Sequence, residues 1–246
     1  MSIKPILFNT EMVQANLDGR KNNTRRIMKP QPVDTEYCNH EMVTFNDMLP
    51  GYYDGDYTCA CRTCGYGVGP SGESMFKPPY VPGDILYVRE TWRIQAAHRF
   101  EADVRIEFKA GGPMATIQFP GCRSQGTERR EYDSFLQKWD RPGWGPSIHM
   151  PKEAARLFLK VTNVRVERLQ DIDEEGAKAE GANFCNGKHV GVKEKMRRSA
   201  VERFADIWNS TIKPADLPLY GWDANPWVWV IEYERCEKPV EVNCNG

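Results

Sequence analysis

The sequence contains no run of about 18 consecutive apolar residues, the length that a membrane-spanning helix requires. Its first residues lack the apolar stretch of a signal peptide, and its formal net charge is only -1. We therefore expect a cytoplasmic protein with no membrane partner. Because no excess of positive charge draws the whole chain toward nucleic acid, any such binding would depend on local basic patches.

We also expect the chain to have no disulfide framework. The chain has eight cysteines among 246 residues, and in a reducing cytoplasm these indicate metal ligands or free thiols rather than a disulfide framework. A mass of 28.2 kDa suits one domain spanning residues 1–246 and enlarged by insertions. The chain is long enough to build a sizeable hydrophobic core.

A basic segment near the N-terminus concentrates the most chemistry in the fewest residues. Residues 6–17 have the pattern of a strand end followed by a short helix, and Gly19 is suited to end that helix in the left-handed conformation. We therefore predict a loop from Arg20 onward. Within it, the hydroxyl of Thr24 follows Lys21 by three residues. The further cationic side chains of this loop are Arg25 and Arg26.

Three interpretations of the basic segment remain open from spacing alone. It is a solvated turn, as most charge runs are, or a contact for phosphate groups and nucleic acid. In the third interpretation, Lys21 lies in a desolvated setting among other cations, loses its proton readily and activates a neighbouring hydroxyl.

A cysteine-rich insertion is predicted at about residues 30–81, where Pro, Gly, Tyr and Asp interrupt any periodicity. It contains a Cys-x-x-Cys followed by Gly, the arrangement of a zinc knuckle, in which a tight turn brings thiolates together. We predict a structural zinc site, since a segment with so few apolar residues would order poorly without a metal. Its predicted ligands are Cys38, Cys61 and Cys64, completed by Cys59 or His40. The alternative is a loop of free thiols.

The rest of the chain alternates strand and helix patterns, which indicates an α+β fold. Strands are predicted at residues 85–88, 99–108, 115–119, 157–169 and 227–233, and helices at 151–156, 174–180 and 190–209. A second insertion, polar and aromatic, is predicted at about residues 110–143. Asp171 or Asp173 is expected to cap the helix at 174–180.

Two further groups of residues are candidates with simpler alternatives. Arg89 and Glu90 end a predicted strand, where they either line a substrate cleft or form an ordinary ion pair at its rim. Trp139 and Trp144 lie near basic residues and could stack bases, although tryptophan is more often a core residue. We do not select His149 as catalytic, because its apolar neighbours are typical of a core histidine.

The motif G-R-K-x-x-T-x-R at residues 19–26 resembles the opening motif of the ASCH-domain family, small PUA-like barrels related to RNA-binding domains. Residues 82–92, 161–181 and 227–233 resemble other conserved stretches of that family. Residues 144–151 and 220–227 resemble the form carried by bacteriophages and prophages. The resemblance implies a mixed β-barrel with flanking helices, in the cytoplasm of a bacterial host if the chain is phage-encoded.

The resemblance also implies an activity. Family members with amidohydrolase activity have a lysine, a threonine and a glutamate at positions that correspond to Lys21, Thr24 and Glu180. The implied substrate is an acylated cytosine derivative such as N4-acetylcytidine, positioned by Arg26, which matches the motif. Arg20 and Arg25 are further candidates for binding the substrate, although Arg25 departs from the family pattern. The alternatives are a module that binds RNA or a modified base in the same cleft without catalysis, and a ribonuclease.

Overall fold

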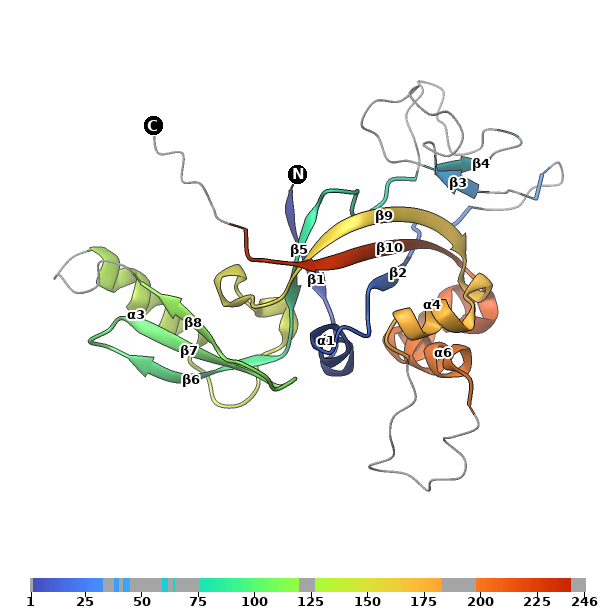
Figure 1. Ribbon diagram of the computed structural model, residues 1–246. Coiled ribbons are helices and arrows are strands. Elements are labelled where there is room, and N and C mark those ends of the chain that lie inside the picture. The colour runs from blue at the N-terminus through green and yellow to red at the C-terminus, as the bar shows by residue number, and fades with distance from the viewer. Residues whose placement is uncertain are drawn as a thin grey trace, which may run out of the picture. The chain divides into compact units, whose positions relative to one another are not determined.

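The computed structural model of the chain is shown in Figure 1. It describes residues 2–32, 38–39, 42–44, 59–61, 64, 76–119, 127–182 and 198–239. The chain forms two compact units, each assembled from segments that are distant in sequence. The first unit comprises residues 1–18, 85–160 and 235–246, and the second comprises residues 19–84 and 161–234. Helices and strands are both present, which confirms the α+β class.

The first unit begins with strand β1 (Ile3–Leu7) and helix α1 (Thr10–Leu17), as the sequence predicts. Asn9 caps the helix by accepting a hydrogen bond from the amide of Met12 at 2.8 Å, and Gly19 follows it at φ +70°, in the left-handed region. Strand β1 pairs in parallel with β5 (Ile85–Arg89), which in turn pairs antiparallel with the start of β9 (Phe158–Arg168).

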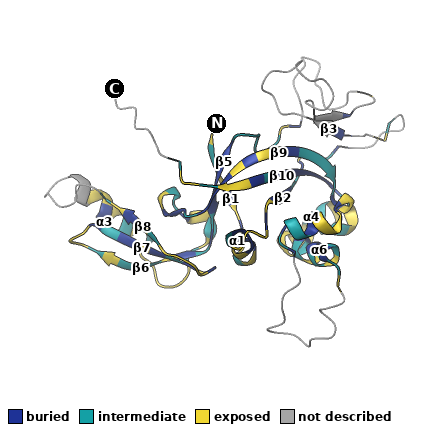
Figure 2. Cartoon of the chain, viewed as in Figure 1, coloured by how far each residue is buried: buried dark blue, intermediate teal, exposed yellow. Residues whose placement is uncertain are grey.

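A second sheet of this unit consists of β6 (Trp92–His98), β7 (Asp103–Phe108) and β8 (Ala115–Gln118), paired antiparallel in that order. The predicted alternation holds in β7, where Val104, Ile106 and Phe108 are buried and the residues between them are more exposed. These side chains belong to one hydrophobic core that also takes in the inner face of α3 (Thr127–Trp139). Figure 2 shows buried residues along these strands.

The second unit contains the remainder of β9, which lies beside β10 (Trp227–Cys236), and β2 (Asn23–Ile27), which pairs antiparallel with β10. Helices α4 (Glu174–Ala179) and α6 (Ala200–Thr211) follow β9 and pack against each other (Figure 1). Their core includes Phe204 and Trp208 from α6 and Val228 and Val230 from β10. The short strands β3 (Met42–Thr44) and β4 (Cys59–Cys61) form a separate antiparallel pair.

The remaining helical segments among the described residues are short. Helix α7 spans Leu217–Tyr220. Within the same ranges, 3-10 turns span Ser147–His149, Lys152–Ala154, Leu169–Asp171, Pro214–Asp216 and Trp222–Ala224. In the described part of the chain, no helix combines the length and apolar composition needed to cross a membrane. Among the same residues the strand orders are open, and no sheet closes into a barrel.

Several boundaries differ from the sequence prediction. Residues 23–27 are a strand rather than a loop, because β10 supplies a long apolar partner along their whole length. Helix α6 begins at Ala200 and not at residue 190, since Ser199 has extended backbone angles and forms a capping box with Glu202. Residues 183–197 lie outside the described residues. Strand β6 and helix α3 were not predicted at all, although Tyr132, Phe135, Leu136 and Trp139 have helical spacing.

Candidate active site

The predicted catalytic residues lie in the second unit, where strand β2 meets the end of helix α4. The amide of Asn22 donates to the carbonyl of Ala179 at 3.0 Å, and the amide of Tyr233 donates to the carbonyl of Asn22 at 2.9 Å. These backbone bonds hold the residues just before β2 between α4 and β10. Asp173 caps α4 by accepting from the amide of Gly176 at 2.7 Å, as predicted, and Glu180 follows the last helical residue as the C-cap.

Lys21 is almost completely buried, with only 1% of its side chain exposed. Its ammonium donates to three oxygen atoms: the Glu180 carboxylate at 2.6 Å, the Glu180 carbonyl at 2.8 Å and the Asn23 carbonyl at 2.8 Å. The last of these carbonyls belongs to the residue that precedes Thr24. The structure therefore brings Lys21 to Glu180 and to the backbone beside Thr24.

Burial lowers the pKa of Lys21 below its ordinary value of 10.5. The carboxylate of Glu180 opposes this shift, because its charge and its hydrogen bond favour the ammonium, and the nearby Arg26 and Arg25 lower the pKa further. Desolvation is the largest of these effects. A lysine in this setting releases its proton more readily than one on the surface.

Arg25 extends the charged cluster beyond the predicted pair. Its Nη1 donates to Glu180 at 3.3 Å, its Nε donates to Glu167 at 2.8 Å, and its Nη2 also bonds Glu167. Only 2% of its side chain is exposed, and the guanidinium lies over the ring of Phe204 at 5.7 Å. Arg25 is therefore placed to hold the two glutamates, and it has almost no exposed surface with which to contact a phosphate.

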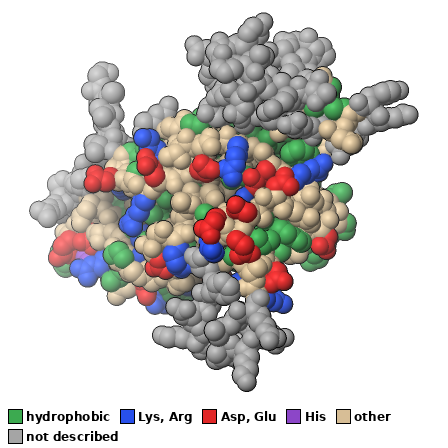
Figure 3. Space-filling model, turned by 45° about the vertical axis from the view of Figure 1, so that its right-hand side comes forward, with side chains coloured by type: hydrophobic (Ala, Val, Ile, Leu, Met, Phe, Trp, Pro, Cys, Tyr) green, Lys and Arg blue, Asp and Glu red, His purple; other side chains and the backbone are tan. Residues whose placement is uncertain are grey.

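Thr24 and Arg26 form a second contact along β2. Arg26 Nη1 donates to the Thr24 hydroxyl oxygen at 3.0 Å, and Thr24 is 2% exposed. A guanidinium on this oxygen favours any negative charge that develops there, and it leaves the hydroxyl hydrogen available to another acceptor. Arg20 is exposed. The face of the protein shown in Figure 3 carries acidic and basic side chains intermixed rather than an expanse of one sign.

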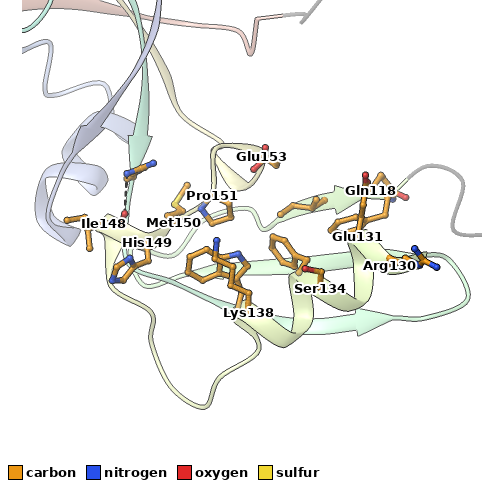
Figure 4. Close-up of a pocket in the computed structure, with 15 residues that line it drawn as sticks. Gln118, Arg130, Glu131, Ser134, Lys138, Ile148, His149, Met150, Pro151 and Glu153 are labelled. Carbon is orange, nitrogen blue, oxygen red and sulfur yellow. Dashed lines mark hydrogen bonds between the residues drawn. The ribbon is translucent and has the colours of Figure 1, made fainter. Parts of the chain in front are cut away.

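Arg89 and Glu90 lie in the first unit, and they do not pair with each other as the rim interpretation required. Glu90 is 1% exposed and accepts a two-point contact from Arg156 Nε and Nη2, both at 2.8 Å. Burial raises the pKa of Glu90, while Arg156 acts in the opposite direction. Arg89 donates to the Ile148 carbonyl at 3.1 Å and lines a cleft of about 900 Å³ beside α3 (Figure 4).

The predicted metal ligands are partly described. The Sγ atoms of Cys38, Cys61 and Cys64 all lie within 4.8 Å of one another, and those of Cys38 and Cys61 are 3.6 Å apart. Three thiols at this spacing could bind a metal ion. The alternatives for a fourth ligand lie outside the description, because His40 and the side chain of Cys59 are not among the described residues.

Two members of the cluster were missed or misread in the sequence. Glu167 was not selected, although it follows Arg165 in the alternating second half of β9, and Arg165 Nη2 contacts it at 3.3 Å. Arg25 was expected to bind substrate and is instead buried.

No family model, curated protein or solved structure matches the chain.

Proposed function

We propose that the second unit is the active centre of an amidohydrolase that removes the acyl group from an acylated pyrimidine nucleoside such as N4-acetylcytidine. The observation that carries the proposal is the contact between Lys21 and Glu180, whose side chains meet at 2.6 Å although they are 159 positions apart. The motif resemblance selects the same two residues without reference to any geometry. A buried lysine and carboxylate of this kind are often found at functional sites.

The first half of the proposed reaction forms an ester on Thr24. The Thr24 oxygen attacks the acyl carbonyl carbon as its proton passes to the Lys21 amine, and Glu180 takes the proton that the resting ammonium must first release. The carbon–nitrogen bond then breaks, and the exocyclic nitrogen of cytidine leaves with a proton returned from Lys21. Arg26 donates to the Thr24 oxygen at 3.0 Å and lowers the energy of its anionic form.

The second half of the reaction hydrolyses the ester. A water molecule attacks the same carbonyl carbon while Lys21 accepts its proton, the bond to the Thr24 oxygen breaks, and acetate is released. Thr24 regains its proton from Lys21. Arg25 and Glu167 act as positioning residues in this scheme, because Arg25 holds Glu180, Glu167 holds Arg25, and neither contacts the reacting atoms.

The competing functions use the same residues differently. A module that binds RNA or a modified base would need Lys21 and Arg25 on phosphates, yet both are buried and paired with glutamates. This burial favours a reaction centre over a phosphate contact. A ribonuclease would attack phosphorus rather than an acyl carbon, and it would therefore act on unmodified RNA.

The proposal is tested by incubating the purified protein with N4-acetylcytidine and measuring cytidine release. We expect turnover by the natural protein and none by the Lys21→Ala variant. The matched control is Lys178→Ala, which removes an exposed lysine that pairs with Glu175 in the same unit. Absence of cytidine release by folded protein across a panel of N-acylated nucleosides would overturn the proposal, and cleavage of unmodified RNA would assign the ribonuclease instead.

We further propose that the cysteine cluster binds one structural Zn²⁺ and that the fold is of the PUA-like type. Cys38, Cys61 and Cys64 supply three thiolates, the ligands that tetrahedral zinc prefers, and Cys59 or His40 supplies the fourth. The metal would join Cys38 and Cys64 to Cys61 on strand β4. It takes no part in the proposed hydrolysis.

Metal analysis tests the zinc proposal separately. We expect close to one equivalent of zinc in protein purified under reducing conditions, and a large loss of zinc in the Cys64→Ser variant. Cys236→Ser, which alters a cysteine of the first unit, should keep its zinc. Well under one equivalent in the natural protein, or equal retention in both variants, would contradict the assignment.

A further inference from the structure

A pocket in the first unit combines aromatic and basic side chains, separately from the proposed active centre. It has a volume of about 380 Å³, within the range of about 300–1,000 Å³ that small-ligand sites occupy. Its lining includes Trp92, Trp139 and Trp144 together with Arg93, Lys138 and Arg141. Among the described residues that line it there is no aspartate or glutamate. The pocket therefore has flat apolar walls and a rim of three cations, of which Arg93 is paired with Glu107 at 2.6 Å.

The loop that carries Trp144 is built against strand β6. The amide of Gly145 donates to the Trp92 carbonyl at 2.7 Å, and the amide of Trp92 donates to the Gly145 carbonyl at 3.3 Å. A side chain at Gly145 would be crowded, since its Cβ would lie 3.3 Å from that same Trp92 oxygen. Gly143 has a φ of +89°, which favours glycine. Glycine is therefore favoured on both sides of Trp144, and the backbone conformation there places the Trp144 ring.

The cations lie against the aromatic rings. Arg93 is 4.5 Å from the centroid of the Trp144 ring, and Lys138 is 4.6 Å from that of Trp139. Trp92 and Trp139 meet edge to face, with centroids 5.7 Å apart. These contacts restrict the movement of the rings. They also keep positive charge close enough to the rings for one nucleotide to contact both.

One polar atom of the pocket lacks a partner. Trp92 is 2% exposed, and its indole N–H has no hydrogen-bond acceptor among the described residues. A buried donor without an acceptor costs free energy. The wall of the pocket therefore contains an unsatisfied donor, beside which the backbone of Gly145 packs.

The pocket shares part of its lining with a larger space. Lys138, Trp139 and His149 line both this pocket and the cleft of about 900 Å³ shown in Figure 4, where Arg130 lies at the far end of α3 from Lys138. Arg89, which lines this cleft, has a buried Nε without an acceptor among the described residues. Two adjoining spaces with a shared aromatic wall suit two successive units of a chain better than one small molecule.

We propose that this pocket, the tryptophan pocket, binds a nucleotide of single-stranded nucleic acid. A base stacks against Trp139 and Trp144, with the buried Trp92 behind them as the floor of the pocket, its phosphates contact Lys138 and Arg141, and the neighbouring nucleotide occupies the larger cleft. Stacking on aromatic rings combined with a basic groove is how proteins hold single strands with little sequence preference. A free nucleotide offers the same base and phosphate, and the length of the probe separates the two sources.

The test measures binding of a fluorescein-labelled cytidylate 10-mer to the full chain by anisotropy, and of cytidine monophosphate by tryptophan quenching. We expect Trp144→Ala to weaken oligonucleotide binding by about tenfold or more, because one stacking partner is lost. Phe100→Ala is the matched control, since it removes an aromatic ring that is 90% exposed in the same unit. Circular dichroism and thermal unfolding verify that both variants are folded.

Charge is tested by a salt series. Lys138→Ala should reduce the slope of log affinity against log salt by about 0.7, the value for one phosphate contact on a single strand, while Lys109→Ala should leave it unchanged. Tighter binding of the 10-mer than of the monophosphate assigns a nucleic acid, and equal binding assigns a free nucleotide. No binding of either probe, or equal effects of Trp144→Ala and Phe100→Ala, would overturn the proposal.

Discussion

Each unit of this protein buries charged side chains, and the two arrangements differ in kind. In the first unit, Glu90 and Arg156 form a two-point pair, and Arg156 also donates to the Pro113 carbonyl at 2.8 Å and lies over the ring of Phe108 at 4.0 Å. Each charge of this pair therefore has the other as its partner. In the second unit, Lys21 and Arg25 share Glu180, and a hydroxyl lies beside them on β2.

The difference shows why burial of charge alone does not mark an active site. A closed pair joins segments of the chain and offers no proton to a substrate. The cluster of the second unit contains a lysine whose pKa is lowered by burial, together with a carboxylate that can take its proton. The first arrangement suits a structural role, and the second is a candidate for chemistry.

The largest expected effect concerns catalysis. Thr24→Val removes the attacking oxygen while keeping the side-chain shape, and we expect N4-acetylcytidine hydrolysis to fall at least about 1,000-fold. Glu90→Gln should leave the rate within about threefold, because that residue is placed in the structural pair. Initial rates at saturating substrate, with each variant shown to be folded, distinguish the two. Equal losses of hydrolysis rate in both variants would show that the two clusters do not differ in function.

The next effect concerns stability. Arg156→Met leaves Glu90 buried without its partner and should cost about 3–5 kcal/mol in urea unfolding. In the double variant Glu90→Gln, Arg156→Met, we expect most of that loss to be recovered, since no buried charge remains. The corresponding double variant of the second unit, Lys21→Met with Glu180→Gln, should recover less, because Arg25 has also lost an acceptor. Full recovery in both units would show that the two clusters are equivalent.

The smallest effect concerns pH. As pH rises, the contribution of the buried group to the free energy of unfolding should fall in the first unit and rise in the second. The folded-state pKa of Glu90 is raised, so its contribution to stability is full below about 4.5 and is lost as pH rises through the folded value. The pKa of Lys21 is lowered, so its contribution is present above 10.5 and is lost as pH falls through the folded value.

Unfolding free energies from pH 4 to pH 10 measure this contrast. Glu90→Gln should remove the part of the unfolding free energy that declines as pH rises. Lys21→Met should remove the part that grows as pH rises. The hydrolysis rate should likewise rise with pH through a value below 10.5 in the natural protein. A rate that is independent of pH over this range would argue against Lys21 as the base.

Local patterns in the sequence predicted much of the fold. The cap at Asp173, the left-handed glycine after α1 and the alternation in β7 depend on interactions within a few residues, and all three are present. Helix α3 also has a clear local pattern, and it was missed because its polar flanks were taken to indicate an insertion. The start of α6 at Ala200 could have been read from the capping box of Ser199 and Glu202.

By itself, the sequence determined the chemical types at the candidate site: a lysine and a threonine three residues apart, and a glutamate at the end of an acidic helix. Only the tertiary structure decided that Lys21 is buried against Glu180 and that Arg25 pairs with Glu167 rather than facing solvent. The reason is physical. A cation's partner, and the dielectric around it, depend on segments that approach from far along the chain, and those approaches are set by the packing of β2, β10 and α4.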